Sequence, residues 1–135
     1  MSWQDFDEAV NQYNVAMRKF FEGDPEPLNK LYSDIDTISL AQLSGSFIIG
    51  RKQVTDTAIH NAAKYREGVT TFETLAKYAA SEVGYVVQVE RTKAKIDGGN
   101  EFVSLALRVT SIFRFEGEVW RLLHRHVDSN VVPQG

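Results

Sequence analysis

The spacing of hydrophobic residues changes at Val69, and this change limits what the chain can fold into. Before Val69, apolar residues recur every three or four positions, as in amphipathic helices. From Val69 onward they alternate with a period of two, which is typical of strands. Helices followed by a run of strands predict an α+β fold, in which the helices cover one face of an antiparallel sheet.

Three helices are predicted in the first half of the chain. The first has Ser2 as its N-cap, and Gly23 suits the left-handed residue that ends a helix. Tyr13 lies on its apolar face, and its hydroxyl group needs a partner if it is buried. That face consists of Trp3, Phe6, Val10, Tyr13, Met17 and Phe20. The elements predicted after it are a helix over 26–32, a short strand within 34–41, a loop over 44–50 and a helix over 51–67.

The second half predicts long strands joined by tight turns. Asp97-Gly98-Gly99-Asn100 is typical of a hairpin turn, because these residues tolerate a positive φ. Strands of this length twist, so we expect a strongly curved sheet. The predicted strands are Val69 to Ala80, Tyr85 to Ile96, Glu101 to Phe115 and Val119 to Val131.

Composition narrows the possible partners. The 135 residues suit a single domain, 1–135, with a net charge of −3 and a pI near 5.6. We expect no nucleic-acid binding, because that needs a concentrated basic face. No apolar run reaches the ~18 residues of a membrane span. The acidic, amphipathic N-terminus differs from a secretory signal, so we expect a cytoplasmic protein. The chain has no cysteine for disulfides or thiolate chemistry.

The last strand carries the most informative side chains. If Glu116 and Gly117 form a two-residue turn, Phe113 lies opposite Trp120, and Val109 lies opposite His124. This register turns one face of the hairpin toward the helices. A one-residue bulge would exchange the two faces along part of the strand. The face predicted to point inward includes Phe113, Trp120, Leu122, His124 and His126, with Asp128 at its end.

Three interpretations of His124 and His126 are open. They can be structural and hydrogen-bonded, they can line a ligand or catalytic pocket, or they can bind a metal ion. The metal interpretation lacks an evident third ligand, because His60 lies off the apolar face of its helix. Asp36 has two interpretations: a turn-forming residue, or a carboxylate at the mouth of a pocket. The opposite face of the hairpin mixes aliphatic and arginine side chains, which suits a subunit interface or solvent.

Several segments together carry a resemblance to a known family. They are Phe20-Phe-Glu-Gly-Asp24, Asp36, Phe47-Ile-Ile-Gly50, Arg108-Val-Thr-Ser-Ile-Phe-Arg114 and Trp120 to Asp128. Over nearly its whole length the chain resembles the SnoaL-like branch of the nuclear transport factor 2-like superfamily. The resemblance implies a cystatin-like cone, in which three helices close one side of a curved sheet around an apolar cavity. It also implies a homodimer formed through the outer sheet face.

The resemblance leaves two functional hypotheses, because this fold hosts both enzymes and non-catalytic modules. In the first, an isomerase, lyase or hydrolase acts on a small apolar carbonyl or hydroxyl compound, without a metal or other cofactor. His124 is then the general acid/base, and Asp36 orients it or takes the proton. In the second, the chain is a ligand-binding or dimerisation module with structural histidines. The predicted ligand-binding residues are Tyr13, Tyr32, Phe113, Trp120, His124, His126 and Asp128.

Overall fold

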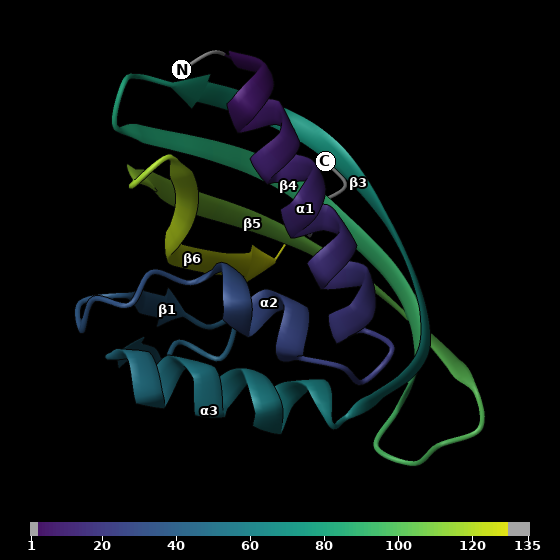
Figure 1. Ribbon diagram of the computed structural model, residues 1–135. Helices are drawn as coiled ribbons and strands as arrows, with labels where there is room; N and C mark the ends of the chain where they lie inside the picture. The colour runs from purple at the N-terminus through teal and green to yellow at the C-terminus, as the bar shows by residue number, and fades with distance from the viewer. Residues whose placement is uncertain (1–2, 130–135) are drawn as a thin grey trace.

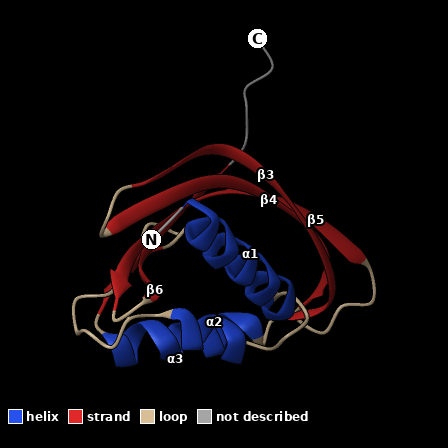
Figure 2. Cartoon of the chain, turned by 45° about the horizontal axis from the view of Figure 1, so that its top comes forward, coloured by secondary structure: helices blue, strands red, loops and turns tan. Residues whose placement is uncertain are grey.

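A computed structural model of the chain describes residues 3–129. Its helices α1 (Trp3–Phe20), α2 (Glu26–Leu31) and α3 (Arg51–Ala62) lie beneath a sheet that arches over them (Figures 1 and 2). The predicted α+β class is confirmed, with the three helices on the concave side of the sheet. We call that concave side the inner face and the convex side the outer face. None of the described helices is long and apolar enough to cross a membrane.

The sheet has six strands in the order β2-β1-β6-β5-β4-β3, and its two edges do not meet. All neighbouring pairs are antiparallel except β1 and β6, which run parallel. This parallel pair departs from the predicted antiparallel sheet. The strands are β1 (Ser39–Ala41), β2 (Phe47–Ile49), β3 (Tyr65–Ala79), β4 (Val83–Ile96), β5 (Phe102–Glu116) and β6 (Val119–Ser129).

The core forms where α1 packs on the inner face. Phe6, Tyr13 and Met17, all on the predicted apolar face of α1, are at most 1% exposed. A Cβ atom on Gly84 would lie 2.6 Å from the ring of Phe6, so only glycine permits this close approach. The apolar face of α1 is confirmed where side chains are described. Ser2, the predicted N-cap, lies outside the described residues.

Two predicted boundaries in the middle of the chain are wrong. The third helix ends at Ala62 and not at 67, because a turn bonds the Lys64 amide to the Asn61 carbonyl oxygen and the strand β3 starts at Tyr65. The ring of Tyr65, at the start of β3, packs 4.9 Å from that of Phe21. The segment predicted as a loop contains the short strand β2, which pairs with β1.

The register of the β5–β6 hairpin decides which side chains face inward. The turn lies at Gly117 and Glu118, so Phe115 pairs with Trp120, and the predicted pairing of Phe113 with Trp120 is wrong. This shift alone would keep every side chain on its predicted face. The faces change because the register slips by one residue between Phe113 and Ile112, where Leu123 is the extra residue on β6.

Beyond the bulge, the two faces of β6 are exchanged. Ser111, on the inner face, pairs with Arg125, whereas Thr110 and Ile112 pair with His126 and His124 on the outer face. Arg125 is only 7% exposed. The inward direction predicted for His124 and His126 is therefore wrong, and Arg125 enters the interior in their place.

Candidate functional site

A cavity of about 430 Å³ lies between the end of α1, the end of α3 and the inner face of the sheet. Its wall is largely apolar, but Glu90 and Arg125 also line it. Asn61 at the end of α3, and Gln42 and Lys64 from neighbouring loops, contribute polar groups. The apolar wall includes Met17, Phe20 and Phe21 near the end of α1, Leu105 and Leu107 on β5, and Val127 on β6.

Glu90 reaches the interior because β4 alternates its side chains between the two faces. Val89 and Arg91 lie on the outer face by this alternation, and Glu90 shares the inner face with Gln88 and Thr92, which are also buried. Its side chain is 1% exposed. Burial raises the pKa of the Glu90 carboxyl group, although the charge of Arg125 and a hydrogen bond from Tyr13 act in the opposite direction.

Tyr13 connects Glu90 to Arg125. Its hydroxyl group donates to Oε2 of Glu90 at 2.8 Å, and Nε of Arg125 donates to the same hydroxyl oxygen at 3.1 Å. The phenolic proton points toward Glu90, and it is free to do so because arginine can only donate. Oε2 is therefore an acceptor, and a proton bound by the carboxyl group resides on Oε1. Oε1 is buried and has no hydrogen-bond partner among the described residues.

Arg125 places a permanent positive charge in this interior. Burial lowers its pKa, but Tyr13, Tyr32 and Glu90 outweigh burial and hold the pKa above its ordinary value. Burial also raises the pKa of Tyr13 and of Tyr32, so both phenols stay neutral. A buried carboxyl group with one unsatisfied oxygen, a phenol and a guanidinium group together provide a proton acceptor beside a stabilising cation.

Two of the predicted ligand-binding residues lie in or beside this network. Tyr13 is part of it, and Tyr32 is buried next to Arg125. Phe113 and Trp120 are instead core residues, with rings 5.5 Å and 5.0 Å from that of Phe6. They do not line the cavity.

The other predicted site residues lie away from the cavity. On the outer face, Nδ1 of His124 lies 2.8 Å from Oγ of Ser39, and the imidazoles of His124 and His126 are 5.7 Å apart. Asp128 accepts two hydrogen bonds of 2.9 Å from Arg108. Asp36 is exposed. The catalytic roles predicted for His124 and Asp36 stay predictions, without support from the position of the cavity.

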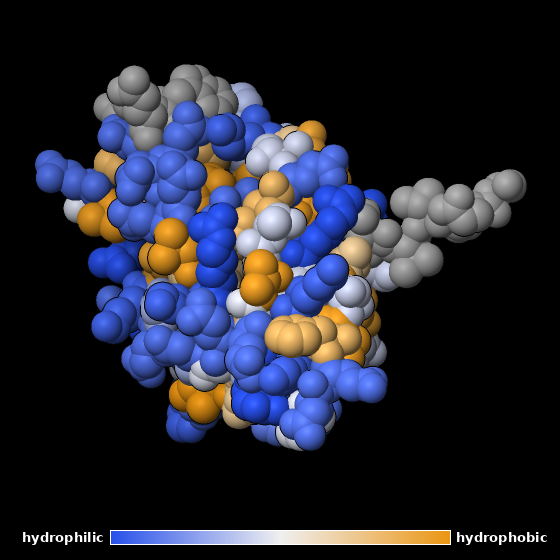
Figure 3. Space-filling view, turned by 90° about the vertical axis from the view of Figure 1, so that its right-hand side faces the viewer, coloured by the Kyte–Doolittle hydropathy of each residue, from blue (hydrophilic) through white to orange (hydrophobic). Residues whose placement is uncertain are grey.

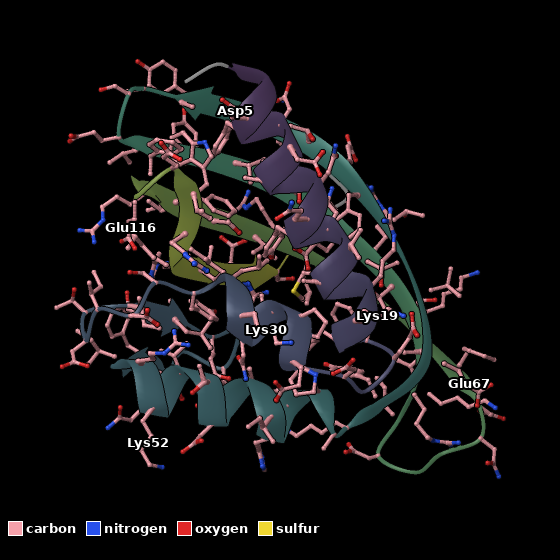
Figure 4. All side chains as sticks on the ribbon, in the orientation of Figure 1. Asp5, Lys19, Lys30, Lys52, Glu67 and Glu116 are labelled. Carbon is pink, nitrogen blue, oxygen red and sulfur yellow. The ribbon has the colours of Figure 1, made fainter. Side chains whose placement is uncertain are left out.

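Charged side chains elsewhere point into solvent. Lys52 on α3 and Glu67 on β3 project away from the body of the molecule (Figure 4). Polar residues also separate the apolar patches on the face shown in Figure 3. Within residues 3–129, no group of three or more His, Cys, Asp or Glu side chains is arranged to hold a metal ion.

Sequence reasoning missed Glu90 and Arg125. The alternation put Glu90 on one face of its strand and Val87 and Val89 on the other. It gave no reason to expect that the face with Glu90 is the buried one. A signal was present: Val86 and Ala94 on the Glu90 side are small and apolar, and both are fully buried. Arg125 was missed because one bulge residue reverses its direction.

A curved six-stranded sheet over three helices, with a cavity on its concave side, defines a cystatin-like α+β cone. The sequence pattern of the SnoaL-like domain matches residues 8–131, and the chain belongs to this family. None of the curated proteins matches the chain.

Solved structures of several bacterial proteins share the fold. A ketosteroid isomerase-like protein from Erwinia carotovora atroseptica is 11% identical, with 96% of each chain covered and a TM-score of 0.79. A nuclear transport factor 2-like superfamily protein from Salmonella enterica is 15% identical, covering 98% of this chain and 95% of its own, with a TM-score of 0.79. A domain with a cystatin-like fold from Nostoc punctiforme is 15% identical, covering 98% and 81%, with a TM-score of 0.76. At these identities the likeness establishes the fold and not the activity.

Proposed function

We propose that the protein binds a small, largely apolar carbonyl or hydroxyl compound in this cavity and transfers a proton through Glu90. The observation that carries the proposal is the state of Glu90: a buried carboxyl group that lines the cavity, with Oε2 held by Tyr13 and Oε1 without a partner. A raised pKa makes the ionised carboxylate a stronger base than an exposed glutamate, which suits proton removal near neutral pH.

The proposed reaction is a proton transfer of the isomerase or lyase type. The ionised Oε1 takes a proton from a carbon next to the substrate carbonyl group, and the electrons of the broken C–H bond move to the carbonyl oxygen as an enolate. Arg125 stabilises that negative charge. Protonated Glu90 then returns the proton to another carbon, or the enolate expels a leaving group. The apolar wall keeps water away from the enolate.

Exchange of hydrogen for deuterium tests this proposal without knowledge of the natural substrate. In deuterated buffer, wild-type protein should speed exchange next to the carbonyl group of cyclic ketones, measured by proton NMR. Glu90→Gln should reduce this exchange to the background rate. Glu73→Gln is the matched control, because Glu73 is an exposed carboxylate on the neighbouring strand, paired with Arg91. Unchanged exchange in Glu90→Gln would refute the role of Glu90, and binding without exchange in wild type would favour a non-catalytic ligand-binding module.

We also propose that two copies associate through the outer sheet face, in the cytoplasm. This face leaves large apolar side chains uncovered: Phe47 is 61% exposed, Ile49 is 55% exposed and Tyr85 is 39% exposed. These side chains lie on β2 and β4, at intervals across the face, and a second copy would remove them from water.

A further inference from the structure

Arg125 is a buried positive charge on the wall of the cavity. Its guanidinium group is buried and lines the cavity, but it makes no ion pair within 4.0 Å among residues 3–129. Among residues 3–129, Glu90 is the only carboxyl group that contributes to its electrostatics, and Tyr13 bonds to both side chains. A buried cation without direct contact to an anion is costly, so an anionic group placed beside it would stabilise it.

Glu90 provides a second hydrogen-bond donor for a ligand, besides Arg125, when its carboxyl group is protonated. Because Tyr13 donates to Oε2, a protonated Glu90 presents its O–H from Oε1. A protonated carboxyl group and a guanidinium group, both bonded to Tyr13 and both lining the cavity, are two donors suited to the two oxygens of one carboxylate. The rest of the wall is largely apolar.

We propose that the cavity selects apolar molecules that end in a single carboxylate, held between Arg125 and protonated Glu90, and that such ligands bind together with one proton. This proposal rests on the proposed function, because the bound ligand imitates the enolate state of the reaction. A carboxylate oxygen lies where the enolate oxygen would lie, and Glu90 is protonated in both cases. Carboxylic acids of this shape are then the substrate or product class, or analogues of the enolate.

The protonation of Glu90 depends on all charged or titratable groups that face it. Tyr13 comes from α1 and Arg125 from β6. Phe72 of β3 pairs with Glu90 and carries Arg18 over its ring at 5.1 Å. Lys64 and Tyr65 line the same cavity from the α3–β3 connection. The cations favour ionised Glu90 when the cavity is empty, and the negative charge of a ligand reverses this preference.

The test uses octanoate, with octanol as its neutral partner of equal chain length. Isothermal titration calorimetry of the full chain in phosphate and in Tris buffer gives the number of protons taken up per bound ligand. Wild type should bind octanoate more tightly than octanol and take up about one proton at a pH above the pKa of Glu90. The affinity for octanoate should fall about tenfold per pH unit in that range.

The variant Glu90→Gln distinguishes the proposed binding of a carboxylate from the proposed catalysis of proton transfer. The glutamine carbonyl group can accept from Tyr13, and its NH2 group can then donate at the position of Oε1 without titrating. Octanoate binding should therefore persist without proton uptake, while ketone exchange is lost. If wild type exchanges ketones but binds octanoate no better than octanol, or without proton uptake, the carboxylate proposal fails and the proposed function stands. If octanoate binds as expected but no ketone exchanges, the proposed catalysis fails.

Arg125→Met tests whether the positive charge of Arg125 is needed to bind the carboxylate. It should remove the preference for octanoate over octanol, with folding checked by circular dichroism and Arg125→Lys as a variant that keeps the charge. Arg91→Met is the control, because Arg91 lies on the same sheet but outside, paired with Glu73. Loss of octanoate binding in Lys64→Met with retention in Arg125→Met would overturn the proposal, since the carboxylate would then bind at the rim.

Discussion

The hydroxyl group of Tyr13 and Oε2 of Glu90 are joined by a buried hydrogen bond of 2.8 Å between residues 77 positions apart in the sequence. This bond attaches the central part of α1 to β4 and also orients Glu90, the only carboxyl group that lines the cavity in the part of the chain that the structure describes. One contact therefore serves both the packing of the helix and the chemistry of the site.

Tyr13→Phe should destabilise the protein by about 1–3 kcal/mol, because Oε2 of Glu90 and Nε of Arg125 each lose a partner in the interior. It should also raise the pKa of Glu90 further, since the hydrogen bond from Tyr13 lowers it. Urea unfolding measures the first effect, and carboxyl carbon NMR measures the second. Tyr85→Phe is the control, because Tyr85 is 39% exposed on the outer face. Equal stability losses in both variants would contradict a role for the Tyr13 hydroxyl group.

The free energy of unfolding should fall as the pH rises above the pKa of glutamate in the unfolded chain. Burial raises the pKa of Glu90 in the folded protein, so between the two pKa values the folded chain binds more protons than the unfolded chain. The contribution of Glu90 is therefore greatest at low pH and is lost as the pH passes the folded pKa. Its slope is at most about 1.4 kcal/mol per pH unit. Urea titrations of wild type and Glu90→Gln at several pH values measure the difference, and parallel pH profiles would contradict the prediction.

His124 should titrate below the ordinary histidine value of about 6.5. Burial is the main cause of its lowered pKa, and the charge of His126, 5.7 Å away between ring centroids, adds to it. His126→Gln should therefore raise the pKa of His124, as followed by proton NMR of the imidazole. His60→Gln is the control, because His60 is exposed on α3. A pKa of His124 that does not move in His126→Gln would exclude coupling of the pair.

Tyr85→Asp should convert a dimer into a monomer in analytical ultracentrifugation if the outer face is the interface. A charge placed among apolar side chains at a subunit contact costs several kcal/mol of association free energy, on the order of a buried unpaired charge. Val15→Asp is the control, because Val15 is 51% exposed on α1, on the helix side of the sheet. A wild-type protein that sediments as a monomer would remove the basis for this proposal.

The fold class could be predicted because it depends on hydrophobic period and turn residues. The apolar face of α1, the Asp97–Asn100 turn and the long strands are all local patterns. The boundary at Tyr65 was wrong, and there Tyr65 packs on Phe21, a residue far away in the sequence. A contact of this kind cannot be predicted from the residues that neighbour Tyr65 in the sequence.

The candidate site could be predicted only in part, for a different reason. Tyr13 followed from its place on a helical face and from the need of a buried phenol for a partner. Arg125 and Glu90 did not follow, because their direction depends on register, and register is a property of two strands together. His124 was placed inward by an uninterrupted alternation that the strand does not keep.

The bulge at Leu123 also bears on how relatives of this protein are compared. Leu122 already pairs with Phe113, and His124 pairs with Ile112, so removing Leu123 would join two residues whose partners are adjacent. A relative one residue shorter at this point can therefore keep Arg125 inside and His124 outside. A gap placed elsewhere in the alignment would match the buried arginine of one protein with an exposed histidine of another. The correspondence of interior residues across the family thus depends on where a single-residue length difference is assigned.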